Sequence, residues 1–256
     1  MELVSDGIRL EVHLAHPQAS AAGGARSRSG LLIAHPFPEL AQGSARGWLT
    51  YPELADRIAA GSGWVCLTVA LRGVAGSEGD FSLGGWLRDL RAALEVLLAE
   101  PDVAGAWVCG FGLGGALALC LAAEDERVLG AASFAAPADV DDWAADPRRF
   151  LEHARAVGVV RDPSFPPDLD RWAKELRDIR PVRVIHRIPP RPLLIVHGSD
   201  DDKVPLVDAR ALADAADEQA DLRVVSSAGH QLRHDPRAIA VLLGWLDREV
   251  TPLGEA

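Results

Sequence analysis

Short apolar runs that alternate with amphipathic helical segments constrain the fold of this chain most strongly. Strands that are apolar along their whole length are typical of a parallel sheet with helices on both faces. The pattern therefore predicts an α/β fold with a mostly parallel, twisted sheet. The predicted strands are 31–34, 64–71, 103–109, 128–135, 193–197 and 222–226, and the predicted helices are 52–60, 86–99, 113–123, 207–217 and 238–248. Alternating apolar and polar residues also predict one half-exposed strand over 8–13.

One interval interrupts this alternation. Residues 138–189 are rich in Pro, Asp and Arg, and they contain Trp143 and Trp172. We expect this interval to form a lid or cap inserted over the strand ends, within a single domain that spans 1–256. The two tryptophans could line a pocket or anchor the lid on the sheet, and the sequence leaves both alternatives open.

The charge balance limits the partners that the chain can have. The sequence has 26 Lys and Arg against 37 Asp and Glu, for a net charge of −11. A chain this acidic repels the phosphates of nucleic acids and anionic lipids. No run reaches the ~18 apolar residues of a membrane span. The first residues lack the basic and apolar regions of a signal peptide, so we expect a cytoplasmic protein with no nucleic-acid or membrane partner.

The cysteines indicate neither disulfides nor a metal site. Cys66, Cys109 and Cys120 each lie inside an apolar run, which is typical of small core residues. Three scattered cysteines make no disulfide framework and no zinc pattern. We expect no metal ion and no other cofactor.

The residues that follow the predicted strands are the candidates for chemistry, because ligands of parallel α/β sheets bind at the carboxyl ends of the strands. The third run leads into 110–115, Gly-Phe-Gly-Leu-Gly-Gly, and then into a helix. Strand, glycine-flanked turn and helix are the setting of the nucleophile elbow Gly-x-Ser-x-Gly. The central position of that pattern holds Gly112 here.

Two later segments complete a recognisable order. The fifth run leads into 197–205, His-Gly-Ser-Asp-Asp-Asp-Lys-Val-Pro, and the sixth is followed by Ala-Gly and His230. With the order elbow, acid and histidine, the chain resembles the α/β-hydrolase superfamily over nearly its full length outside 138–189. The resemblance implies an α/β-hydrolase fold with Asp201 as the acid and His230 as the base, and Asp200 is the alternative acid.

Two loops add to the resemblance. His-Pro-Phe-Pro at 35–38 is similar to the family's oxyanion loop, and the glycine-rich segment 72–79 is similar to the loop after its fourth strand. The resemblance implies an oxyanion hole made by the backbone N–H groups of Phe37 and Leu113. Pro36 and Pro38 have no N–H to donate.

The departure from the family lies at the elbow. Members that transfer acyl groups attack with the elbow serine, but Gly112 has no side chain and cannot form an acyl-enzyme. The elbow residue normally has a positive φ, which glycine adopts at little cost. We therefore expect the fold to survive while this chemistry is lost.

Other chemically capable side chains are expected to have structural or surface roles. Cys109 should point into the core, and Ser133 lies within a predicted strand. His35 and His197 stand at strand ends as structural histidines, His234 is expected at the surface, and Asp139 is a spare acid that more often caps a helix. The remaining serines considered, Ser77, Ser164 and Ser199, lie in loops.

Three functions remain open. The favoured one is a non-catalytic or very weakly active relative of esterases and peptidases that binds a small acyl-like or ester-like molecule, or a partner, in the old pocket. The second is an enzyme that uses His230 and Asp201 as a general base, for water activation or lyase-type proton transfer, without an acyl-enzyme. The third is an esterase-type hydrolase whose serine was exchanged deliberately. The ligand and the oligomeric state cannot be predicted from these residues.

Overall fold

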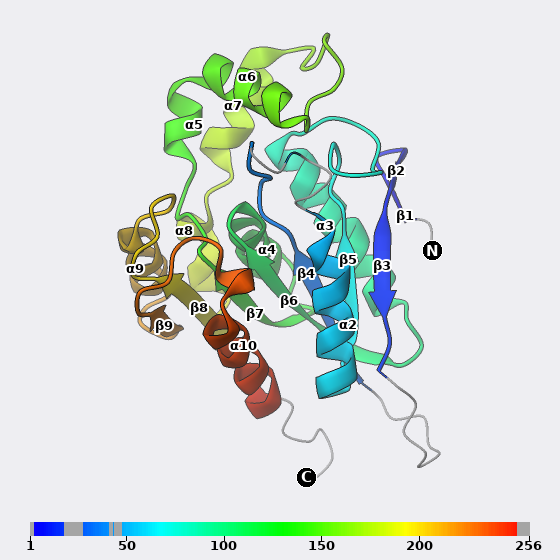
Figure 1. Ribbon diagram of the computed structural model, residues 1–256, viewed down its shortest axis with the longest axis vertical. Helices are drawn as coiled ribbons and strands as arrows, with labels where there is room; N and C mark the ends of the chain where they lie inside the picture. The colour runs from blue at the N-terminus through cyan, green and yellow to red at the C-terminus, as the bar shows by residue number, and fades with distance from the viewer. Residues whose placement is uncertain (1–2, 18–27, 41–42, 44–47, 250–256) are drawn as a thin grey trace.

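The computed structural model describes residues 3–17, 28–40, 43 and 48–249 (Figure 1). Its centre is a seven-stranded sheet in the order β3-β5-β4-β6-β7-β8-β9. Neighbouring strands run parallel except β3, which pairs antiparallel with β5 at one edge. The predicted mostly parallel α/β sheet is therefore confirmed. The strands are β3 (Val12–Ala15), β4 (Arg28–Ala34), β5 (Val65–Val69), β6 (Val103–Phe111), β7 (Val128–Phe134), β8 (Leu193–Gly198) and β9 (Asp221–Val225).

Helices cover both faces of this sheet. In Figure 1, α2 (Thr50–Ser62) and α10 (Pro236–Glu249) lie in front of the strands, and α3 (Leu83–Leu98) and α4 (Leu113–Glu124) lie behind them. α9 (Leu206–Ala215) packs on β8 and β9. Leucines of α3 at the predicted helical spacing are buried against the sheet. Among the described residues, no helix combines the length and the apolar character needed to cross a bilayer.

The predicted strand over 8–13 is wrong in one respect, because the structure divides it in two. β2 (Ile8–Leu10) pairs with β1 (Leu3–Ser5) in a separate two-stranded sheet, whereas β3 joins the large sheet. Glu11 stands at the corner, where its N–H donates to Ser77 Oγ at 2.9 Å. Its carbonyl accepts from Ala70 N–H at 2.9 Å. Both halves keep the same alternation, so the pattern alone carries no sign of the break.

Residues 138–189 contain no strand and lie between β7 and β8. They form four short α-helices and a 3₁₀ turn, of which α5, α6 and α7 lie beyond the ends of the central strands (Figure 1). Trp172 is buried, and its indole N–H donates to the Phe81 carbonyl at 3.0 Å. Trp143 stacks on Phe150, with 4.1 Å between ring centroids, and lines a cavity. Trp143 therefore lines a pocket, whereas Trp172 attaches α7 to the segment that contains Phe81. The helices are α5 (Asp141–Ala145), α6 (Pro147–Val157), α7 (Leu169–Asp178) and α8 (Pro181–Val184), and the 3₁₀ turn is η1 (Ile185–Arg187).

Close backbone packing joins β6, α4 and the loop that follows β4. A Cβ atom added to Gly110 would lie 2.3 Å from the Gly114 carbonyl oxygen, and one added to Gly114 would lie 2.2 Å from the His35 carbonyl oxygen. Real Cβ atoms do not approach backbone oxygens this closely. The absence of side chains at these two positions therefore lets the start of α4 touch the loop at 35–38.

This packing predicts opposite effects for two glycine-to-alanine substitutions in helices. Gly114→Ala should lower the free energy of unfolding by about 1–3 kcal/mol, because the new methyl group overlaps the His35 carbonyl. Gly244→Ala is the control, since a Cβ there meets nothing within 4 Å in α10, and it should raise stability by about 0.5–1 kcal/mol. Urea unfolding of both variants measures the difference. Unchanged stability of Gly114→Ala would show that the contact does not matter.

Candidate functional site

The turn from β6 into α4 has the backbone shape that the elbow requires. Gly112 has φ +51° and ψ −126°, a conformation that most L-residues avoid. Its N–H donates to the Phe134 carbonyl at 2.8 Å, and its carbonyl accepts from Ala116 N–H at 3.1 Å. Hydrogen bonds on both sides therefore hold this turn in place, and its tip faces the carboxyl ends of the strands.

His230 and Asp201 meet beside this turn. His230 Nδ1 lies 2.9 Å from Asp201 Oδ2. The other carboxylate oxygen, Oδ1, accepts the N–H groups of Lys203 and Val204, each at 2.9 Å. Because a carboxylate only accepts, Nδ1 carries the proton and Nε2 is left as an acceptor. His230 and Asp201, referred to below as the dyad, therefore fix the tautomer of the imidazole.

The carboxyl group of this pair is held in its ionised form. The Asp201 side chain is fully buried, while the His230 side chain keeps 20% of its surface exposed. Burial alone would raise the pKa of Asp201, but the hydrogen bonds from His230, Val204 and Lys203 outweigh it and place the pKa below its ordinary value. The negative charge therefore remains available to stabilise a proton on the imidazole.

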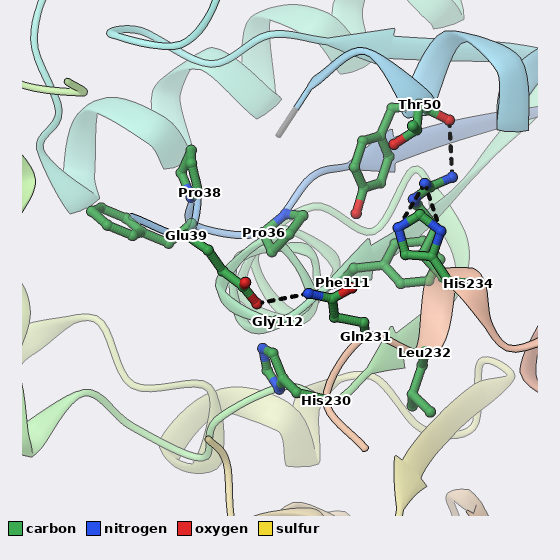
Figure 2. A pocket seen from close by; sticks show the side chains of 13 residues that line it. Pro36, Pro38, Glu39, Thr50, Phe111, Gly112, His230, Gln231, Leu232 and His234 are labelled. Carbon is green, nitrogen blue, oxygen red and sulfur yellow. Dashed lines mark hydrogen bonds between the residues drawn. The ribbon is translucent and has the colours of Figure 1, made fainter. Parts of the chain in front are cut away.

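The free ring nitrogen of His230 points to the space above Gly112. A Cβ atom built on Gly112 would lie 3.5 Å from His230 Nε2 and 3.0 Å from Pro36 Cβ. Figure 2 shows the imidazole, the glycine turn and Pro36 around this space. A small side chain on residue 112 would consequently reach hydrogen-bond distance of Nε2 if Pro36 moved by a few tenths of an ångström.

The structure separates Asp201 from the other acids that the sequence offers. Asp200 accepts from Ser199 Oγ at 2.6 Å in an exposed position, and the His230 ring bonds to Asp201 instead. Asp139 accepts from the Asp141 N–H at 3.0 Å, at the start of α5. These contacts leave Asp201 as the carboxylate that meets the imidazole.

Two buried histidines support the loops of the site. His35 Nδ1 lies 2.7 Å from the Pro36 carbonyl, and its Nε2 accepts from Leu71 N–H at 3.1 Å. Burial lowers the pKa of His35 to about 4, so the ring stays neutral. His197 Nε2 lies 2.9 Å from the Val204 carbonyl and 3.4 Å from Asp201 Oδ2. Both rings therefore hold loop backbone at strand ends, as expected of structural histidines.

The two predicted oxyanion donors face the same cavity. Phe37 lies in the loop after β4, and Leu113 begins α4, where the backbone N–H groups have no partners within the helix. Neither N–H donates to another group in the described part of the chain. Both residues line the cavity above the elbow.

The cysteine and serine side chains considered as alternative nucleophiles lie away from this space. Cys109 and Cys66 are fully buried, and burial raises the pKa of both thiols. Ser133 is also fully buried, and its hydroxyl has no partner within the described residues. Neither these three side chains nor the loop serines Ser77, Ser164 and Ser199 line a cavity at the elbow.

Two cavities meet at Gly112 and His230. The larger has a volume of about 650 Å³ and extends under α5 to Trp143 and Asp208. The smaller has a volume of about 70 Å³ and extends to Tyr51 and Arg233. No motif marks Tyr51 or Arg233 in the sequence, so neither was predicted as a site residue, whereas Gly112 and His230 were. In Figure 2, a hydrogen bond of 3.1 Å from the Gln231 amide to the Glu39 carboxylate spans the space in front of the elbow.

Comparisons with known proteins identify the family and the fold of this chain. The sequence profile described as "Alpha/beta hydrolase family" matches residues 31–242. Among solved structures, the alpha/beta hydrolase GrgF from Penicillium sp. sh18 has a TM-score of 0.70 at 19% identity, with 97% of each chain covered. Est1E from Butyrivibrio proteoclasticus with bound ferulic acid has a TM-score of 0.69 at 20% identity, again with 97% of each chain covered.

A serine hydrolase homologue from Coxiella burnetii is also similar, with a TM-score of 0.64 at 20% identity and coverage of 98% of this chain and 96% of that one. A search of curated proteins found no match. At these identities the solved structures establish the fold alone, whereas the profile covers most of the chain. This chain belongs to the alpha/beta hydrolase family.

Proposed function

We propose that Gly112 occupies the position of the family's nucleophilic serine, and that this chain binds a small molecule above it without forming an acyl-enzyme. The observation that carries the proposal is the glycine at the tip of a turn with φ +51°, in front of an imidazole with a free Nε2. An acyl-enzyme needs an oxygen or sulfur nucleophile at this point, and glycine supplies neither.

The larger cavity supports binding of a small organic ligand. Its volume of about 650 Å³ lies within the range of ~300–1,000 Å³ that is typical of small-molecule sites. Phe37, Val140 and Trp143 contribute apolar walls, and His230 contributes a polar group. An acyl-like or ester-like ligand would place its hydrocarbon against these walls and its carbonyl oxygen on the N–H groups of Phe37 and Leu113. The bound ferulic acid of Est1E is a small molecule of comparable chemistry.

We further propose that 138–189 acts as the lid of this cavity. Trp143 and Val140 line the cavity from this interval, and the Phe37 ring lies 5.3 Å from Trp143 and 5.6 Å from Phe150. The aromatic contacts connect the lid directly to the oxyanion loop. The side chains of the lid would therefore determine which hydrocarbon the cavity accepts.

A second candidate function uses the dyad as a general base. His230 Nε2 is an acceptor, and the space beside Gly112 has room for the oxygen atom of a water molecule in place of a serine hydroxyl. Nε2 would take a proton from this water while its oxygen bonds to the ester carbonyl carbon. The carbonyl oxygen would accept hydrogen bonds from the N–H groups of Phe37 and Leu113. The departing alkoxide would then take the proton from the imidazolium. Sites without one triad member retain rates about 10³–10⁴-fold over water.

Covalent labelling tests the assignment of Gly112. The native chain should not react with a fluorophosphonate probe, whereas Gly112→Ser should be labelled, because the new hydroxyl lies within reach of His230 Nε2. The double variant Gly112→Ser with His230→Ala should lose the label, and intact mass spectrometry quantifies all three proteins. Labelling of the native chain on any serine, or a folded Gly112→Ser that stays unlabelled, would contradict the assignment.

Hydrolysis of p-nitrophenyl esters separates the two candidate functions. For binding alone, the native chain and His230→Ala should hydrolyse p-nitrophenyl butyrate at the same rate, within error. His16→Ala serves as the control, because His16 is an exposed histidine directly after β3 and lines neither cavity at the elbow. A native rate more than about tenfold above that of His230→Ala, with His16→Ala unchanged, would replace the binding function by the general-base function.

A further inference from the structure

The smaller cavity contains the guanidinium group of Arg233, which forms no ion pair with a carboxylate of the described residues. Arg233 donates to the Thr50 carbonyl at 3.1 Å, and a second nitrogen lies 2.9 Å from the His234 ring. Its Cζ atom lies 5.3 Å from the centre of the Tyr51 ring. These partners are uncharged, since burial and the adjacent guanidinium lower the pKa of His234. No carboxylate in the part of the chain that the structure describes forms an ion pair with Arg233.

This cationic group is also partly removed from water. Arg233 is half-buried, and burial lowers its pKa, although an arginine remains protonated at neutral pH. Glu53 attracts this charge from a distance but forms no ion pair with it. A half-buried charge without a directly paired carboxylate favours an anion in the space that it faces. The other basic side chains near the elbow differ, as Lys203 lies beside Asp202 at 3.3 Å. Arg233 is therefore the group around which an anion would bind.

Tyr51 adds a second group that points to a ligand. Its side chain is only 3% exposed, and it lines the smaller cavity. Its hydroxyl has no hydrogen-bond partner among the described residues. Burial raises the pKa of Tyr51, so the hydroxyl is a neutral donor rather than a phenolate. A ligand that supplies an acceptor to this buried, unpaired hydroxyl would gain a hydrogen bond, and this hydrogen bond would strengthen its binding.

We propose that the smaller cavity binds the carboxylate of a small organic acid, held by Arg233 and Tyr51, with the rest of that ligand in the larger cavity. The proposal rests on the proposed function, because it names the ligand class of the same site. The smaller cavity, with a volume of about 70 Å³, fits a group of a few atoms. Gly112 and His230 line both cavities, so a ligand that reaches from one to the other passes in front of His230.

The charges of the two cavities orient such a ligand. Among the described residues, the larger cavity is lined by one cationic side chain, Lys203, and by four aspartates besides Glu39, so its lining is net negative, and burial raises the pKa of Asp208. The four are Asp139, Asp141, Asp142 and Asp208. An anionic group is repelled there and attracted by Arg233. Glu39 lines both cavities and accepts from the neutral Gln231 amide, so its charge does not distinguish the two cavities. The ligand is therefore expected to carry one carboxylate, at the Arg233 end, and an uncharged remainder.

Matched acids and amides test this assignment on the full chain. Hexanoate and benzoate are compared with hexanamide and benzamide by calorimetry or saturation-transfer NMR. The acids should bind the native chain more tightly than the amides by about 10–100-fold, because the guanidinium forms charge-assisted hydrogen bonds with a carboxylate but not with an amide. Arg233→Gln should remove this preference, and Arg233→Lys should restore part of it.

Two further variants complete the experiment. Tyr51→Phe removes an unpartnered hydroxyl, so the protein should fold normally and bind the acids several-fold more weakly. Arg237→Gln is the matched control, because Arg237 pairs with Asp235 at 2.6 Å outside the smaller cavity, and acid binding should not change. Equal binding of acids and amides would overturn the carboxylate subsite and leave the ligand cavity standing. Unchanged acid binding by Arg233→Gln would overturn the subsite as well, and so would the absence of binding of either acid to the native chain. The labelling and ester experiments test the proposed function separately.

Discussion

Backbone contact at the turn from β6 into α4 is the constraint on which the site depends. Gly110 and Gly114 allow the helix to start against the strand and against the His35 carbonyl, with no side chain between them. This contact places the N–H of Leu113 and the loop that contains Phe37 along one cavity. The same contact holds the turn that contains Gly112 against the loop after β4, and the imidazole of His230 lies across the space above Gly112.

Some polar groups around the elbow have hydrogen-bond partners, and others have none among the described residues. Asp201 receives three hydrogen bonds, and the two buried histidines each hold a loop carbonyl or N–H. By contrast, His230 Nε2, the N–H groups of Phe37 and Leu113, and the hydroxyl of Tyr51 have no partner within the described residues. Unpaired polar groups cost free energy when water is excluded, so their convergence on connected cavities is typical of a binding site rather than of a core.

Much of this arrangement could be predicted from the sequence, for identifiable reasons. Continuous apolar runs predict a parallel sheet because such strands are buried on both faces. The family pattern at 197–205 distinguishes Asp201 from Asp200, and the structure places the Asp201 carboxylate against the His230 ring. The break at Glu11 could not be predicted, because β2 and β3 keep the same alternation. No sequence motif marks Arg233 or Tyr51. They stand out because the arginine has no paired carboxylate and the hydroxyl has no acceptor among the described residues, and tertiary packing alone determines both.

We propose that no side chain of the cleft forms a covalent intermediate. Intact-mass measurement of the native chain, quenched during exposure to a slowly hydrolysed aryl ester and followed by peptide mapping, tests this proposal. The unmodified mass of the chain should persist throughout, since glycine has no atom that can carry an acyl group. An acyl adduct on a hydroxyl or thiol of the cleft, formed by the native chain and absent from His230→Ala, would contradict the claim.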